Sequence, residues 1–226
     1  MRTAAALVFA CLCALAATAA TASEQSFTFR AYVSGRIVET WSYTKSDRTP
    51  ACTRRTRSKG SRVVLFRSAA PARVQLAPAR RPRDPARLPP TQITSITGTL
   101  QYRPGNASTT STCEPSTVIE CTTTVQPFGQ GALRMRTRKN GTVALGRIRH
   151  PLLGGPLRGC GAVVNRRTGD VDLVDGQSIP TRELGNATIE LRARYTATTL
   201  LELQGFDSGS LLTTVDWKLR LVRGAS

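Results

Sequence analysis

The chain has 226 residues, of which 32 are lysine or arginine and 14 are aspartate or glutamate, so its formal net charge is +18. This length allows one large domain or two small ones with a sizeable core. Serine and cysteine hydrolases usually take a histidine as their base, and the chain has only one histidine. We therefore expect a protein that is not an enzyme, with no catalytic residue and no cofactor.

The N-terminal segment 1–22 has the features of a secretory signal. Arg2 precedes a run of small and apolar residues that ends in Ala20-Thr21-Ala22, the pattern that signal peptidase cleaves. We predict a mature chain from 23 to 226 that is secreted or held at the cell surface. An uncleaved anchor remains open, because the apolar run approaches the shortest length that spans a bilayer. No later segment does, so no membrane span is expected after cleavage.

Four cysteines remain in the predicted mature chain: Cys52, Cys113, Cys121 and Cys160. An even number in an exported protein favours two disulfides. They lack the close Cys-x-x-Cys pairs of zinc sites, so we expect no metal site. The sequence does not select one of the three possible pairings. The gap of seven residues between Cys113 and Cys121 favours a local bridge, and Cys52 would then pair with Cys160.

Alternation of apolar and polar residues dominates the mature chain and predicts β-strands with one solvated face. The segment 213–222 (TTVDWKLRLV) shows it best, and the segment 27–44 is predicted to be a hairpin with a turn at Ser34-Gly35. Asn140-Gly141 is predicted to be a second hairpin turn. Further strands are expected within 62–68, 72–78, 93–103, 133–139, 142–148, 162–166, 170–174, 187–197 and 199–205.

This pattern predicts an all-β fold, an antiparallel β-sandwich of about ten short strands, with a closed β-barrel as the alternative. The segment 77–90 contains five prolines and four arginines, and is predicted to be a loop. Trp41 and Trp217 are expected to be two parts of one core, so we predict a single domain over 23–226. The threonine-rich segment 105–124 is expected to be a surface excursion that a disulfide closes.

Basic residues are unevenly distributed. Segment 160–226 has eight basic and eight acidic residues, so the charge of +17 that remains without Arg2 lies between 23 and 159, which indicates one basic region. The stretch 52–62 (CTRRTRSKGSR) is its densest part. A polyanion site there would use these residues: Arg54, Arg55, Arg57, Lys59, Arg62, Arg134, Arg136 and Arg138.

Two interpretations of this stretch remain open. Arg55, Arg57 and Lys59 would share one face of an extended segment, and contacts with an anionic polymer of the cell envelope would be sensitive to salt. The other interpretation is a solvated connector beside a disulfide. We expect no specific binding of nucleic acid, because Phe66 is the only aromatic residue between Tyr43 and Tyr102.

The run 52–68 (CTRRTRSKGSRVVLFRS), preceded by Trp41, and the closing VDWKLRL of 215–221 resemble secreted proteins of high-GC bacteria. The resemblance covers these two patches. It implies an exported bacterial β-protein, and it brings no activity, cofactor or catalytic residue.

Three functions are compatible with these observations. The first is an exported binding protein that is not an enzyme and that holds an anionic polymer of the cell envelope or the extracellular space. The second is a secreted hydrolase with a carboxylate-based site, for which Asp170, Asp172 and Asp175 form the densest acidic group. The third is a secreted protease inhibitor that uses the 113–121 loop.

Overall fold

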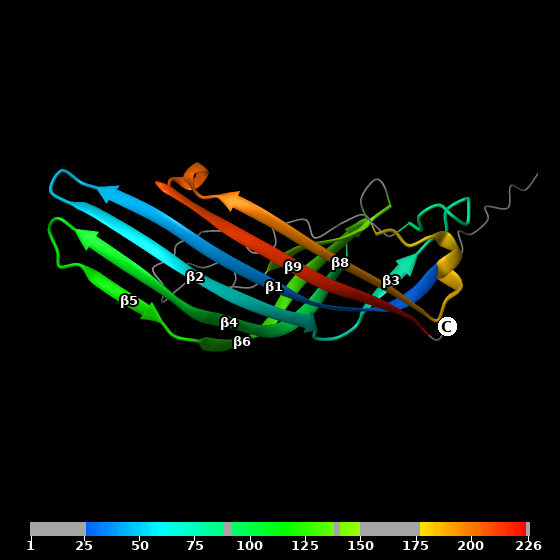
Figure 1. Cartoon of the computed structure of the whole chain (residues 1–226). Coiled ribbons are helices and arrows are strands. Elements are labelled where there is room, and N and C mark those ends of the chain that lie inside the picture. Colours follow the sequence, from blue (N-terminus) through cyan, green and yellow to red (C-terminus); the bar gives the residue numbers. More distant parts are fainter. Residues whose placement is uncertain (1–25, 88–91, 138–140, 150–176, 225–226) are drawn as a thin grey trace, which may run out of the picture.

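The computed structural model describes residues 26–87, 92–137, 141–149 and 177–224. They form nine antiparallel strands in one open sheet, in the order β7-β6-β4-β2-β1-β9-β8, with β3 beside β1 and β5 beside β4 (Figure 1). The predicted all-β antiparallel fold is confirmed. The strands are β1 Phe27–Arg48, β2 Thr53–Ser68, β3 Ala72–Leu76, β4 Gln92–Ser111, β5 Thr117–Cys121, β6 Thr124–Thr137, β7 Val143–Arg149, β8 Thr188–Leu200 and β9 Ser208–Arg223.

The sheet encloses its own core. In Figure 1, β6 and β7 pass behind β1 and β9. Leu133 of β6 and Val143 of β7 accordingly belong to the same buried cluster as Ile37 of β1 and Trp217 of β9. The two ends of one continuous sheet therefore cover each other, which gives the sandwich-like arrangement. The remaining described segments include two 3-10 turns, η1 Thr181–Gly185 and η2 Glu202–Gln204.

Strand β1 is longer than expected, and the predicted turn at Ser34-Gly35 is wrong. The strand runs without interruption for 22 residues and pairs with β9 along most of its length. Gly35 lies opposite Phe66 of β2 and Trp217 of β9. A Cβ atom at Gly35 would collide with the Phe66 ring. Glycine is needed there because an aromatic ring covers the backbone, not because the chain turns.

Odd-numbered residues of β1 point toward the core and even-numbered residues point away from it. We call the side of the sheet that carries the odd-numbered residues of β1 the inner face and the other side the outer face. The end near Phe27 and Arg223 is called proximal, and the end near Arg48 and Thr53 is called distal. The inner face carries two hydrophobic clusters. The larger hydrophobic cluster lies toward the proximal end and includes Phe29, Ile37, Phe66 and Trp217. The distal cluster contains Trp41, Tyr43, Cys121, Leu201 and Leu211.

A buried ion pair lies between the two clusters along β1. Glu39 and Arg62 are opposite each other in the β1–β2 register. Arg62 Nε donates a hydrogen bond of 2.5 Å to Glu39 Oε2, and their side chains are only 4% and 3% exposed. Thr213 of β9, also buried, is the other cross-strand neighbour of Glu39. Two charges in an apolar interior are tolerated only as a pair, because each alone would cost several kcal/mol of desolvation.

The stretch 52–62 is not a connector. From Thr53 onward it belongs to β2, which is hydrogen-bonded to β1 on one side and to β4 on the other. Gly60 lies opposite Trp41, and a Cβ atom there would collide with the indole. The most basic stretch of the chain is thus part of a central strand.

The predicted disulfide between Cys113 and Cys121 is wrong, since Cys52 pairs with Cys113, with their Cα atoms 5.6 Å apart. The bond ties the β1–β2 connection to the β4–β5 connection at the distal end. Cys121 is also disulfide-bonded, to a partner outside the described residues. The segment 105–124 is accordingly no excursion: β4 continues to Ser111 and β5 pairs with it.

Several predictions fall outside the described residues: the signal segment 1–22, Asn140, Cys160, the acidic group Asp170, Asp172 and Asp175, and the strands within 162–174. The hairpin of β6 and β7 that was expected around Asn140-Gly141 is formed. Within the described part of the chain, no helix has the length and hydropathy needed to cross a membrane.

Removing one partner of the buried pair should be far more damaging than removing both. We expect Arg62→Met to lower the free energy of unfolding by about 3–5 kcal/mol, because Glu39 would remain as a buried unpaired charge. The double variant Glu39→Leu/Arg62→Met should regain at least about 2 kcal/mol of this loss. Urea denaturation of the three proteins measures both values. A double variant no more stable than the single one would contradict this account.

The Cys52–Cys113 disulfide closes a long loop, with a sequence separation of 61 between its cysteines. We expect Cys52→Ser/Cys113→Ser to lose about 4 kcal/mol of stability, because the bridge restricts the unfolded chain. Peptide mapping of the unreduced protein checks the pairing directly. A fragment that joins Cys113 to Cys121 would overturn it.

Candidate functional site

Three of the predicted basic residues form a row on the outer face of β2. Arg55, Arg57 and Lys59 occupy alternate positions and all three side chains are exposed. Alternate residues of a strand are roughly 7 Å apart, so the cations are evenly spaced along a straight line. We call these three residues the distal row. None of them forms an ion pair with another described residue.

The strands on both sides of the distal row present hydroxyl and amide groups and no carboxylate. On β1 the cross-strand neighbours are Ser42, Thr44 and Ser46. On β4 they are Asn106, Ser108 and Thr110. The result is a three-by-three grid with three cations along its centre and hydrogen-bonding side chains on either side. Arg103, which is exposed and faces Ser61, extends the basic surface beyond Lys59.

Two acidic side chains lie at the border of this grid: Glu120 of β5, which is exposed and is the cross-strand neighbour of Asn106, and Asp207. Asp207, in the connection between η2 and β9, accepts a hydrogen bond of 2.5 Å from Ser46 Oγ. This hydrogen bond is the main reason why the pKa of Asp207 is below its ordinary value. The Ser46 backbone N–H and the charges of Arg55 and Arg48 lower the pKa further. Asp207 therefore stays ionised and partly offsets the charge at one end of the row.

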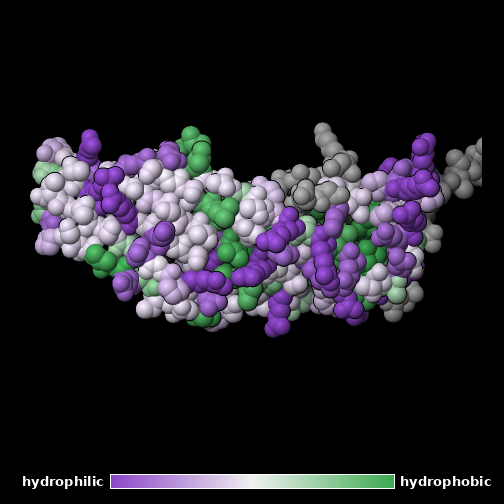
Figure 2. Space-filling model, in the orientation of Figure 1, coloured by the Kyte–Doolittle hydropathy of each residue, from purple (hydrophilic) through white to green (hydrophobic). Residues whose placement is uncertain are grey.

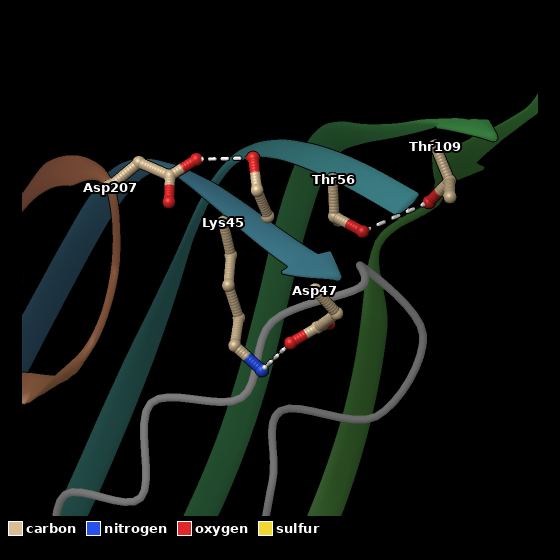
Figure 3. A network of polar contacts seen from close by, with 6 residues as sticks. Lys45, Asp47, Thr56, Thr109 and Asp207 are labelled. Carbon is tan, nitrogen blue, oxygen red and sulfur yellow. Dashed lines mark hydrogen bonds and ion pairs between the residues drawn. The ribbon is translucent and has the colours of Figure 1, made fainter. Parts of the chain in front are cut away.

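Other polar contacts at the distal end lie on the inner face. Lys45 Nζ and Asp47 Oδ1 are 2.9 Å apart, and they meet on the opposite side of β1 from Asp207 (Figure 3). Thr56 and Thr109 join β2 to β4 through their hydroxyl groups, 3.3 Å apart. Arg54 is exposed but belongs to this face, so it does not extend the distal row.

The remaining predicted residues do not join the distal row. Arg62 is buried against Glu39, so its charge is already neutralised in the core. Arg134 is exposed on β6, but it pairs with Ile93 of β4, whereas Lys59 pairs with Asn106 of that strand. Roughly 40 Å of strand separates these two positions. The two arginine rows therefore do not form one flat surface. The side chains of Arg136 and Arg138 are outside the described part of the structure.

Other basic residues, all exposed except the half-buried Lys218, were missed. They lie on the proximal half of the outer face: Arg36, Arg67, Arg192, Arg194, Lys218 and Arg220. Counting charges by segment hid the four of them that lie in 160–226, because that segment is neutral as a whole. The alternation in 190–194 and 216–220 was the available signal for these four, since it places charged residues at every second position of these strands.

This surface offers hydrogen-bond donors and positive charge, groups that interact favourably with anions. Among the described residues, no group of three or more His, Cys, Asp or Glu side chains could hold a metal ion. The 113–121 segment lacks the local disulfide on which the inhibitor hypothesis rested. No protein-family model, curated protein or solved structure matches this chain.

Removing the Ser46 hydroxyl should change the titration of Asp207. We expect Ser46→Ala to raise the pKa of Asp207 toward its ordinary value, because the main hydrogen bond to the carboxylate is lost. A carboxyl group whose pKa is lowered by folding stabilises the folded protein at pH values above its ordinary pKa. This stabilisation is lost as the pH falls through the pKa of the group in the folded protein. The variant should therefore lose part of this acid-sensitive stability.

Carboxyl NMR titration of both proteins measures the shift. The pKa of Glu202 is the internal control, because its own backbone N–H and that of Gly209 keep it low, and Ser46 takes no part. An unchanged pKa of Asp207 in the variant would assign its shift to the Ser46 backbone N–H and the arginines instead.

Proposed function

We propose that this protein is an exported binding protein, without enzymatic activity, that holds an anionic polymer of the cell envelope or the extracellular space on the outer face of its sheet. The observation that carries the proposal is the distal row with its uncharged polar borders. The disulfide is compatible with an exported protein, since such bonds persist mainly outside the cytosol.

The position of the row in the sheet argues against a purely protective role. Charged residues on an edge strand prevent edge-to-edge aggregation. β2 is not an edge strand, because it pairs with β1 and β4. Three like charges on neighbouring outward positions also repel one another, so the row adds nothing to the stability of the free protein. A bound anion would remove this repulsion.

The chemistry of the grid favours phosphate or carboxylate groups on an extended chain. Arginine presents a planar set of donors that matches both groups, and the flanking serine, threonine and asparagine side chains can add hydrogen bonds. A small molecule would be expected in a concave site, whereas evenly spaced cations on a strand suit a repeating anion. No aromatic residue belongs to the grid, so base stacking would contribute nothing.

The test compares two triple variants of the mature, disulfide-bonded protein. The first changes Arg55, Arg57 and Lys59 to Ser. The matched control changes Arg80, Arg81 and Arg83 to Ser, which removes the same charge from an exposed loop outside the grid. Binding to inorganic polyphosphate, polygalacturonate and duplex DNA is measured at increasing salt.

We expect the row variant to bind at least one polymer more weakly. The slope of log binding constant against log salt concentration should become shallower by about 3, because each lost phosphate contact reduces this slope by about 1. The control variant should keep the wild-type slope. Equal weakening in both variants would mean that total charge, rather than the row, governs binding, and would refute the proposal.

A further inference from the structure

A second basic group lies on the same outer face, toward the proximal end. It consists of Arg36, Arg67, Arg192, Arg194, Lys218 and Arg220, and we call these six residues the proximal cluster. They come from four neighbouring strands, β2, β1, β9 and β8, and the β-sheet register places them in adjacent cross-strand rows. One row contains Arg192 and Lys218, and the next contains Arg194 and Arg36.

Two carboxylates lie among these cations and do not neutralise them. Glu190 is 2.7 Å from Lys218 Nζ and 3.6 Å from Arg192 Nη2. Asp216 lies between Arg36 and Arg194, as the cross-strand neighbour of both. Six basic residues against two acids leave a clear positive excess. Arg36, Arg67 and Arg194 form no ion pair with any other described residue.

Protection of the sheet edge explains only part of the proximal cluster. Arg192 and Arg194 belong to β8, which is at one end of the strand order, so their charges can guard that edge. The other four basic residues are on β1, β2 and β9, each of which has a strand on both sides. Their outward charge has no such structural role.

An uncharged waist separates the proximal cluster from the distal row on β8, β9, β1 and β2, whereas on the neighbouring strand β4 the exposed Arg103 lies beside Ser61. Across β8, β9, β1 and β2 it contains Thr196, Thr214, Val38 and Val63, and then Thr198, Leu212, Thr40 and Ser61. Along β1, Arg36 is six positions from Ser42, the partner of Lys59, which corresponds to roughly 20 Å. Figure 2 shows several strongly hydrophilic residues at the left end and a larger group from the middle of the molecule to its right end, with mostly paler residues between the two groups.

We infer that the proximal cluster is a second site for the polymer of the proposed function, and that one polymer chain crosses the waist and occupies both sites at once. The inference rests on the proposed function. When one chain engages both sites, the second contact is intramolecular and raises the affinity without any new interaction. Occupation of both sites also sets a minimum length for the polymer chain. The distance along β1 from Ser34, beside the proximal cluster, to Ser46, beside the distal row, is about 40 Å.

The test uses inorganic polyphosphate in two fractions, with extended lengths below about 20 Å and above about 40 Å. Three proteins are compared by calorimetry and salt titration: wild type, the distal-row variant described above, and Arg36→Ser/Arg67→Ser/Arg194→Ser. The loop variant at Arg80, Arg81 and Arg83 is the charge-matched control. Thermal unfolding confirms that each variant is folded, and exposed side chains of this kind rarely affect stability.

The inference expects two short chains per wild-type molecule, one per molecule of either site variant, and one long chain per wild-type molecule. With the long fraction, each site variant should lose about 3 in log–log salt slope, while the loop variant loses none. For wild type alone, the slope should be steeper with the long fraction than with the short one, a comparison that needs no variant.

Two results would overturn the inference, and they differ in what they say about the proposed function. If only the distal-row variant loses affinity, and the length of the chain does not change the wild-type slope, then the proximal cluster is not a site and the proposed function stands. If neither site variant differs from the loop variant, the proposed function fails as well.

Discussion

The buried Glu39–Arg62 pair determines how β1 and β2 fit together. Opposite charges in the core are acceptable only when they face each other, so a shift of one residue would set Glu39 beside Ser61 or Val63 and leave Arg62 without its partner. The pair therefore specifies a register that continues over 15 cross-strand pairs. The same register sends the side chains of the distal row outward, so an interaction in the core positions the candidate surface.

Glycine–aromatic contacts on both sides of the ion pair reinforce this register. Trp41 covers Gly60 on the distal side, and Phe66 covers Gly35 on the proximal side. In each pair one strand supplies the ring and the other supplies the glycine, and the roles are exchanged between the two pairs. A larger residue at either glycine would collide with the ring, so two long strands with few large apolar residues near their centre still pack closely.

The sequence was informative about the type of structure and less so about its extent. Alternation predicted most of the described strands, but the segment 199–205 contains the end of β8 and the turn η2, and β5 was not predicted. The apparent turn at Ser34-Gly35 was misleading, although the alternation kept the same parity through it. Arg62 and Phe66 are both even-numbered residues, so alternation along one strand places them on the same face. This signal could have placed the Arg62 side chain in the core. The disulfide was not predictable from sequence distance, because Cys52 and Cys113 meet only after β2 and β4 pair. The proximal cluster needed the order of the strands, which alternation alone does not give.

The location of the distal row on a central strand determines what kind of binding it favours. A basic loop must become ordered when it holds a polymer, and the entropy lost reduces the affinity. Here the backbone is already held by β1, β4 and, at the distal end, the Cys52–Cys113 bond. Only side chains have to be immobilised, and the spacing of the cations is that of the strand itself. In the proposed function, such a surface would select a polymer by the repeat distance of its anions as well as by its total charge.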